Sequence, residues 1–269
     1  MVGDNPVTFI DNSVKKQNNR DIRKKIMEFK LGIFDEQIPF CIDVTPGMFK
    51  LSEIVPFARE LSSKVSNIIL EKKRTNGITV PCRKGCAACC SYLVPLSVPE
   101  TFHLREEVLA MPEETRKSVL DLFLCRARRI LEEKPEEANL LDINQLSDWY
   151  SNLELPCPFL SDNICTVYDK RPIACREYLV EGSEILCRPD KQGDFHKVEL
   201  PFSVLECLGK LCAELEQTEI EAIMIPLALP WAEENLNRNE KRWPVLEIIQ
   251  RLIEIIGESV TNSCSVHIV

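Results

Sequence analysis

The chain has 269 residues, of which 45% are apolar and 28% are charged, and its formal net charge is −9. A chain of this length and composition can bury a sizeable core, so we expect a globular protein. The acidic balance argues against nucleic acid as a partner, because binding to a phosphate backbone usually needs a basic face.

Neither a signal peptide nor a membrane span is expected. Residues 1–6 lack a basic stretch followed by an apolar one. The most apolar stretch, Ile223–Trp231, has nine residues and two prolines, which is too short to cross a bilayer. We therefore expect a cytoplasmic protein without a membrane partner. Disulfides are not maintained in the cytosol, so a cysteine-dense pattern there indicates metal binding or catalysis.

The N-terminal part of the chain is expected to be the least regular. Residues 1–28 are polar and weakly periodic and predict an arm, and we interpret its basic run, Lys15–Lys25, as a solvated surface. Residues 29–44 alternate between apolar and polar positions and predict a short β-hairpin. Pro39 would confine its own strand to the edge of a sheet, because proline has no N–H to donate.

The rest of the chain predicts helices around an irregular centre. Residues 51–74 predict an amphipathic helix with Ser52 as its cap and Gly77 beyond its end. Residues 97–100, Ser-Val-Pro-Glu, resemble a capping box that opens a helix over residues 99–111. Apolar periodicity predicts further helices over 113–133, 142–153, 202–217 and 244–258.

The fold class expected from these elements is mainly α. Residues 154–198 are rich in turn signals, as in a chain that wraps around a ligand. We expect a small helical domain with an irregular, cysteine-rich metal-binding centre and a short N-terminal hairpin. Its boundaries would be 29–269, with a core motif region over 82–187 and a helical C-terminal part over 199–269.

Eight of the thirteen cysteines lie within that motif region and form two groups. Thiolates are strong ligands for zinc and iron, so this density of sulfur predicts a metal or iron–sulfur site. The candidate ligands are Cys82, Cys86, Cys89, Cys90, Cys157, Cys165, Cys175 and Cys187.

The first group, in the run PCRKGCAACC, fits one face of a helix that begins at Pro81. At helical spacing its four thiols share an arc of roughly 100°. A helix N-terminus would lower their pKa, and Arg83 and Lys84 add positive charge nearby. The alternative is that these cysteines are small core residues, which accounts poorly for four in nine positions.

One segment cannot complete a four-coordinate site, because the adjacent Cys89 and Cys90 diverge along any regular backbone. The second group must therefore contribute. Eight thiols could close two tetrahedral zinc sites, or four could hold one [4Fe–4S] cluster while the others line the pocket or bind a second centre. Arg171 and Arg176 flank Cys175 and either offset the charge of the thiolates or form ordinary surface ion pairs.

These residues also carry a family resemblance. CRKGCAACC, followed by CPFL, CTVYDKRPIACREY and Cys187, resembles the CxxCxxCC zinc- or iron-chelating family of YkgJ-like cysteine-cluster proteins. The resemblance covers Cys82 to Cys187, and the segment PLSVPE after the first cluster is also similar. One departure is the extra residue between Cys82 and Cys86, which shifts the first ligand by one position.

The resemblance implies an iron–sulfur or zinc protein, and some members are linked to flagellin lysine N-methylation. That activity would need S-adenosylmethionine, but the chain has no glycine-rich strand-to-helix fingerprint for it. The spacing of Cys82, Cys86 and Cys89 also equals that of radical S-adenosylmethionine enzymes. Against that alternative, no aromatic residue precedes Cys89, no strand–helix alternation predicts a barrel, and Cys90 is left without a role.

Several other residues have simpler structural interpretations. We expect structural roles for the three histidines, because thiols already suffice as ligands. Core packing is the simplest account of the remaining cysteines, and Tyr168 and Tyr178 are expected to pack over the cysteine centre. The histidines are His103, His196 and His267, and the cysteines are Cys41, Cys125, Cys207, Cys212 and Cys264.

The sequence thus predicts a metal-binding protein, with an iron–sulfur cluster slightly ahead of zinc because paired C-x2-C knuckles are absent. In one hypothesis the centre is a cofactor for redox chemistry or methyl transfer, with a protein substrate or redox partner. In the other, zinc is structural and the helical flanks bind another protein.

Overall fold

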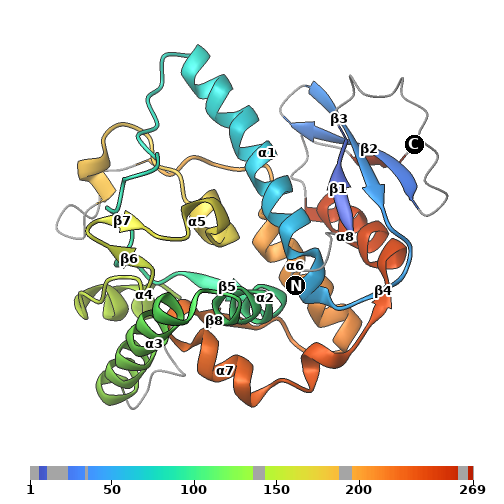
Figure 1. Ribbon diagram of the computed structural model, residues 1–269. Helices are drawn as coiled ribbons and strands as arrows, with labels where there is room; N and C mark the ends of the chain where they lie inside the picture. Colours follow the sequence, from blue (N-terminus) through green and yellow to red (C-terminus); the bar gives the residue numbers. More distant parts are fainter. Residues whose placement is uncertain are drawn as a thin grey trace.

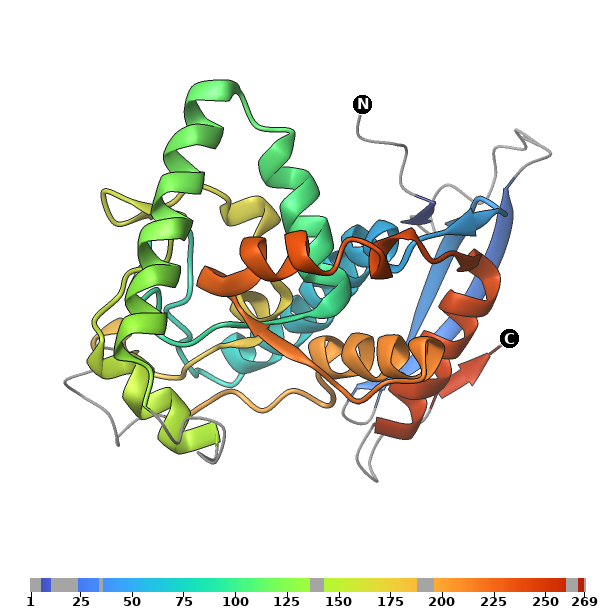
Figure 2. The same cartoon turned by 90° about the horizontal axis from the view of Figure 1, so that it is seen from below.

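The computed structural model describes residues 6–10, 24–33, 36–135, 143–187, 196–259 and 266–268. A small β-sheet lies at one side of a larger helical body, and helix α1 (Val55–Thr75) runs from the sheet into that body (Figures 1 and 2). The described part of the chain contains no helix that is both long and apolar enough to span a membrane.

The sheet is antiparallel and has the strand order β1-β3-β2-β10. Strands β2 and β3 pair along their whole length, from Lys25 opposite Val44 to Ile33 opposite Glu36. The buried residues of these strands that join the core formed with α1 and α8 (Val245–Ser259) are Phe29, Leu31, Ile33, Phe40, Ile42 and Val44. The strands are β1 (Val7–Phe9), β2 (Lys25–Ile33), β3 (Glu36–Val44) and β10 (Val266–Ile268).

The predicted hairpin is confirmed but is longer than expected. Strand β2 begins at Lys25, and β1 also lies in the sheet, so parts of the segment 1–28 are strand and do not belong to a free arm. Their pairing depends on backbone hydrogen bonds to β3, which side-chain periodicity does not reveal. Pro39 lies in the half of β3 that pairs, within the described residues, with β2 alone, as an edge position requires.

The first helix begins differently from the prediction. A 3₁₀ turn, η2 (Leu51–Ile54), precedes α1, and the Glu53 carboxylate accepts the Lys50 N–H at 2.7 Å. Ser52 is buried and donates its hydroxyl to Glu106 Oε1 at 3.4 Å, so its predicted role as the cap is wrong. The helix ends at Thr75, and Gly77 beyond it has a positive φ of 75°.

The main helices confirm the predicted ones to within about three residues at either end. The predicted capping box is present at α2, where Glu100 N–H donates to the Ser97 hydroxyl at 3.4 Å. These helices are α2 (Val98–Leu109), α3 (Glu113–Glu133), α4 (Ile143–Asn152) and α6 (Val204–Glu216), together with α8.

Two short helices were not predicted. Helix α7 (Ala228–Glu234) contains Pro230 in its first turn, a position that tolerates proline because its N–H would be unbonded there. Helix α5 (Ile173–Glu177) is a single turn inside the cysteine-rich segment. Short 3₁₀ turns complete the chain: η4 (Tyr168–Lys170), η5 (Glu184–Cys187), η7 (Ile225–Leu227) and η8 (Arg238–Glu240).

The described residues also form three two-stranded ladders, two of which connect distant segments. In two of them, β4 (Met48–Phe49) pairs with β9 (Trp243–Pro244), and β5 (Pro95–Ser97) pairs with β8 (Ala222–Met224). The third, β6 (Leu160–Ser161) with β7 (Ile164–Cys165), lies within the cysteine region. The β5–β8 ladder therefore fixes the chain just after the first cysteine group to the C-terminal part.

Candidate metal centre

The first cysteine group is a series of tight turns. Hydrogen bonds run from Cys86 N–H to Arg83 O (3.1 Å) and from Cys90 N–H to Ala87 O (3.0 Å). Gly85 has φ of +90°, a conformation that a continuing α-helix does not allow. The predicted helix from Pro81 is therefore wrong, and with it the expectation that a helix N-terminus acts on these thiols.

The second group meets the first through the backbone. Cys157 N–H donates to the carbonyl oxygen of Cys90 at 2.7 Å, which places these residues side by side although 67 positions separate them in the sequence. Leu160 N–H then donates to Cys157 O at 3.0 Å, and Leu160 is the strand partner of Cys165. The β6–β7 hairpin thus returns Cys165 toward Cys157.

Cys175 lies in the single turn of α5. The preceding Pro172 has φ of −54° and leads directly into that turn. The buried Glu100 carboxylate of α2 accepts the N–H of Ile173, the first residue of α5, at 2.9 Å. Helix α5 also packs against α1. Both helices therefore fix the position of Cys175.

Cys187 ends the 3₁₀ turn η5, on a segment that is tied to the start of the first group. Gly182 N–H donates to Thr79 O at 2.8 Å. Two ion pairs reinforce this contact: Lys73 with Glu181 at 2.6 Å, and Arg83 with Glu184 at 3.0 Å. The segment that carries Cys187 therefore lies beside the one that carries Cys82.

The electrostatics of the thiols agree with the contact between the two groups. A hydrogen bond to the Cys90 thiol, followed by burial, raises the pKa of Cys89 far above its usual value. Burial, together with the charges of Cys165 and Cys89, raises the pKa of Cys157 to about 11. Cys89 belongs to the first group and Cys157 and Cys165 to the second, so thiols of both groups act on one another.

Burial and repulsion also raise the pKa of two further thiols, Cys187 and Cys175. Burial raises the pKa of Cys187 to about 11, with added repulsion from Cys82, Cys89 and Cys86. Burial also raises the pKa of Cys175 well above its usual value. At Cys82 and Cys89 the expected lowering of the thiol pKa is thus reversed, because burial and repulsion from neighbouring thiols disfavour the thiolates.

The donor set fits a soft metal. Burial and repulsion would both be offset by a cation among the thiols, which binds them as thiolates and displaces their protons. Within the described residues, no three Cys, His, Asp or Glu side chains already stand in an arrangement that would hold a metal ion. Backbone hydrogen bonds bring the segments that carry Cys90 and Cys157 together.

The two arginines have different surroundings. The positive charge of Arg171 lowers the pKa of Cys82, Cys89 and Cys175, although burial outweighs it at each. Its guanidinium also lies 4.2 Å from the ring centre of Tyr168. Arg176 instead donates to the carbonyl oxygens of Asp169 (2.7 Å) and Arg171 (2.9 Å). Arg171 therefore offsets thiolate charge, whereas Arg176 holds the loop before α5.

Aromatic rings lie around the centre, as expected in part. Burial raises the pKa of Tyr178, as do the charges of Tyr92, Cys187 and Cys89, which places Tyr178 beside the thiols. Tyr92 was not singled out from the sequence, yet its ring lies 6.0 Å from that of Tyr178. The signal that could have found it is its position two residues after Cys90.

The remaining predicted residues divide into confirmed and corrected ones. Cys41, Cys207 and Cys212 are buried as expected, but Cys125 is exposed on α3, so core packing is wrong for it. This residue occupies a turn of α3 that faces solvent, beside Leu124, which is also exposed. Cys264 lies outside the described residues.

The contacts described for His103 and His196 are with groups other than the thiols. His103 is 9% exposed on α2, and its Nε2 lies 3.5 Å from Glu107 Oε1, an ordinary helix pair. His196 is exposed, and its carbonyl oxygen accepts the Glu181 N–H at 2.9 Å. The backbone of His267 lies in β10.

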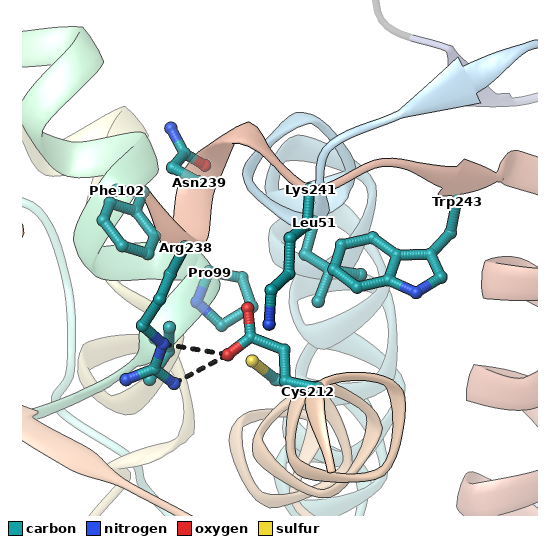
Figure 3. Close-up of a pocket in the computed structure, with 10 residues that line it drawn as sticks. Leu51, Pro99, Phe102, Cys212, Arg238, Asn239, Lys241 and Trp243 are labelled. Carbon is teal, nitrogen blue, oxygen red and sulfur yellow. Dashed lines mark hydrogen bonds and ion pairs between the residues drawn. The ribbon is translucent and has the colours of Figure 1, made fainter. Parts of the chain in front are cut away.

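A separate shallow pocket lies between η2, α2, α6, η8 and the segment that follows η8 (Figure 3). Leu51, Phe102 and Trp243 give it apolar walls, and Arg238 forms an ion pair with Glu216 at 2.7 Å. Of the cysteines, only Cys212 lines it, so this pocket is distinct from the candidate metal centre.

The comparisons with known proteins agree with this location. Residues 81–192 match the CxxCxxCC family, which is described as a putative zinc- or iron-chelating domain. The match begins at Pro81 and includes all eight candidate ligands. Neither the curated proteins nor the solved structures contain a match to this chain.

Proposed function

From the premise that residues 81–192 form a CxxCxxCC zinc- or iron-chelating domain, we propose that the eight cysteines bind an iron–sulfur cluster or zinc. The observation that carries the proposal is the joining of the two groups by the 2.7 Å hydrogen bond from Cys157 N–H to Cys90 O. The charge of Cys89 acts on thiols of both groups, which supports a shared centre.

An iron–sulfur cluster, [4Fe–4S] in type, is the first candidate. The thiols come from loops and single turns, and the paired C-x2-C knuckles typical of structural zinc sites are absent. Burial among Tyr92, Tyr178 and the β6–β7 hairpin would limit solvent access, a property that tunes cluster potentials. When bound, such a cluster would supply electron transfer to a redox partner or to a reaction on a protein substrate.

In that case this chain's own residues would supply charge and position. Arg171 would offset the negative charge of the thiolates, because its charge already acts on Cys82, Cys89 and Cys175. Glu100 would hold α5, and thereby Cys175, in place. Methyl transfer with S-adenosylmethionine, as in flagellin lysine N-methylation, rests on the family resemblance alone.

The second candidate is a structural zinc module. The thiols lie on the segment after α1, the β6–β7 hairpin, α5 and η5. A metal bound by them would therefore cross-link much of the helical body. The flanking helices would then bind another protein. We place either form of the protein in the cytoplasm, where thiols stay reduced.

Anaerobic purification followed by metal analysis separates these candidates. Broad absorbance near 400 nm with iron and acid-labile sulfide would support the iron–sulfur cofactor. Colourless protein with stoichiometric zinc would support the structural module. Protein that holds neither metal, even after incubation with zinc or after iron–sulfur reconstitution, would contradict the proposed function.

A further inference from the structure

We infer that the eight thiols form two separate four-thiol sets that meet at the Cys89–Cys90 pair; this inference rests on the proposed metal-binding function. Set A contains Cys82, Cys86, Cys89 and Cys187. Set B contains Cys90, Cys157, Cys165 and Cys175.

Set A is held together by the contacts between the segment after α1 and the loop before η5. The hydrogen bond from Gly182 N–H to Thr79 O (2.8 Å) brings these two segments together. The ion pair between Arg83 and Glu184 (3.0 Å) joins the residue after Cys82 to the turn that ends at Cys187. Cys86 follows through the turn that its own N–H closes on Arg83 O.

Set B is held together by different contacts. Cys157 N–H bonds to Cys90 O at 2.7 Å, and the β6–β7 hairpin returns Cys165 to the same place. Cys175 follows on α5, where the Arg176 side chain bonds to the carbonyl oxygens of Asp169 and Arg171. Those bonds fix the short segment between Cys165 and Cys175.

The pair Cys89–Cys90 divides naturally between the sets. The thiols of Cys89 and Cys90 lie within hydrogen-bond reach of one another, so the two sets would meet at this pair. Cys90 N–H closes a turn on Ala87 O, while Cys90 O is the acceptor for Cys157. Cys90 is therefore the residue bonded directly to set B, and Cys89 is left for set A.

The electrostatic couplings between the thiols follow this division except at Cys89, which acts on thiols of both sets. The thiol of Cys187 is acted on by Cys82, Cys89 and Cys86, which are the other three members of set A. The thiol of Cys175 is acted on by Cys157 and Cys165 of set B. Cys89 also acts on Cys175 and Cys157, which places the two sets next to one another.

Four thiolates are the complete ligand set of one structural zinc ion or one [4Fe–4S] cluster. Each thiol releases one proton when it binds the metal, so each filled set would release four. Two filled sets would place the negative charges of eight thiolates close together. Arg171 acts on Cys82 and Cys89 of set A and on Cys175 of set B, so it would offset both.

Metal stoichiometry of the full-length protein tests this division. We expect the wild-type protein to hold two centres per chain, read by native mass spectrometry and elemental analysis after loading with zinc alone. Cys187→Ser and Cys165→Ser should each lose one centre. Cys86→Ser combined with Cys187→Ser, both in set A, should still lose only one. Cys187→Ser combined with Cys165→Ser should lose both.

The wild-type count is decisive even if some variants fail to fold. One centre per chain, lost in Cys187→Ser and Cys165→Ser alike, would overturn the two sets and leave the proposed function standing. No bound metal in the wild-type protein would overturn both. Cys125→Ser is the matched control, because Cys125 is an exposed cysteine of the same region outside both sets, and it should keep two centres.

Discussion

The carboxylate of Glu100 accepts the backbone N–H of Ile173 at 2.9 Å, although the two residues are 73 positions apart. Its other oxygen lies 3.2 Å from the Ser97 hydroxyl and 3.4 Å from the Ser97 N–H. One fully buried side chain therefore completes the capping box of α2 and also caps α5. Through this bond α2 positions the turn that carries Cys175.

Glu100→Ala should lower the free energy of unfolding by about 2 to 4 kcal/mol. The substitution leaves two buried N–H groups, those of Ser97 and Ile173, without their acceptor. Urea unfolding at neutral pH would measure the loss, and metal content should fall because α5 loses its cap. Glu113→Ala, an exposed first-turn residue of α3, should cost under about 1 kcal/mol. Equal losses in the two variants would refute the double cap.

Cys86→Ser and Cys165→Ser should lower the metal content of the purified protein, because each removes a thiolate that a hydroxyl does not replace for a soft metal. Elemental analysis of the purified variants checks this expectation. Cys125→Ser should retain the wild-type metal content. If all three variants lost metal equally, the assignment of the ligands would be wrong.

Gly182→Ala should destabilise the protein by about 1 to 2 kcal/mol and reduce metal binding. Gly182 has φ of +95°, which alanine adopts only with strain, and an added Cβ would lie 3.2 Å from Leu186 Cδ1. The hydrogen bond from Gly182 N–H to Thr79 O also joins the segment that leads to Cys82 and the segment that leads to Cys187. Thermal unfolding and zinc titration would measure the two effects.

Gly77→Ala is the control for that variant. Gly77 has a similar φ of +75° with open space around it, at the end of α1. It should lose comparable stability, yet its zinc affinity should stay at the wild-type level. A matching loss of zinc affinity in both variants would mean that Gly182 acts only through general stability.

Glu177→Gln should change how stability depends on pH. Burial raises the pKa of Glu177 to about 7 from its usual 4.5, despite hydrogen bonds from the Ser203 hydroxyl (2.7 Å) and the Val204 N–H (2.8 Å). A raised carboxyl pKa means that the folded state binds the proton more tightly. The protonated Glu177 carboxyl therefore stabilises the folded state fully below pH 4.5. This stabilisation is lost as the pH rises through about 7.

Glutamine keeps an acceptor for the Val204 N–H and cannot ionise. The variant should therefore gain stability relative to the wild-type protein between pH 5 and pH 8, by up to about 3 kcal/mol. Urea unfolding at several pH values gives this difference directly, because other titrating groups cancel. Glu219 is exposed, so the stability of Glu219→Gln should depend on pH in the same way as that of the wild-type protein. If the unfolding free energies of Glu177→Gln and the wild-type protein differed by the same amount at every pH, ionisation of Glu177 would have no role.

The long elements were predictable because their signals are local. Helix α3 matches its predicted bounds, and the capping box at Ser97 is where the spacing of Ser and Glu placed it. Strand β1 and helix α7 were missed for physical reasons. Three residues of strand carry too little pattern, and Pro230 in a first turn resembles a helix breaker until its position is known.

The sequence by itself determined the mainly helical class, the sulfur-rich composition of the centre and the family match of residues 81–192, because residue type and spacing carry all three. Only the tertiary structure decided that the first cysteines lie in turns, that Cys157 is bonded to Cys90 through the backbone, and that burial raises the pKa of the Cys157 thiol. Backbone hydrogen bonds between distant segments and the exclusion of water exist only once the chain has packed, so no local pattern records them.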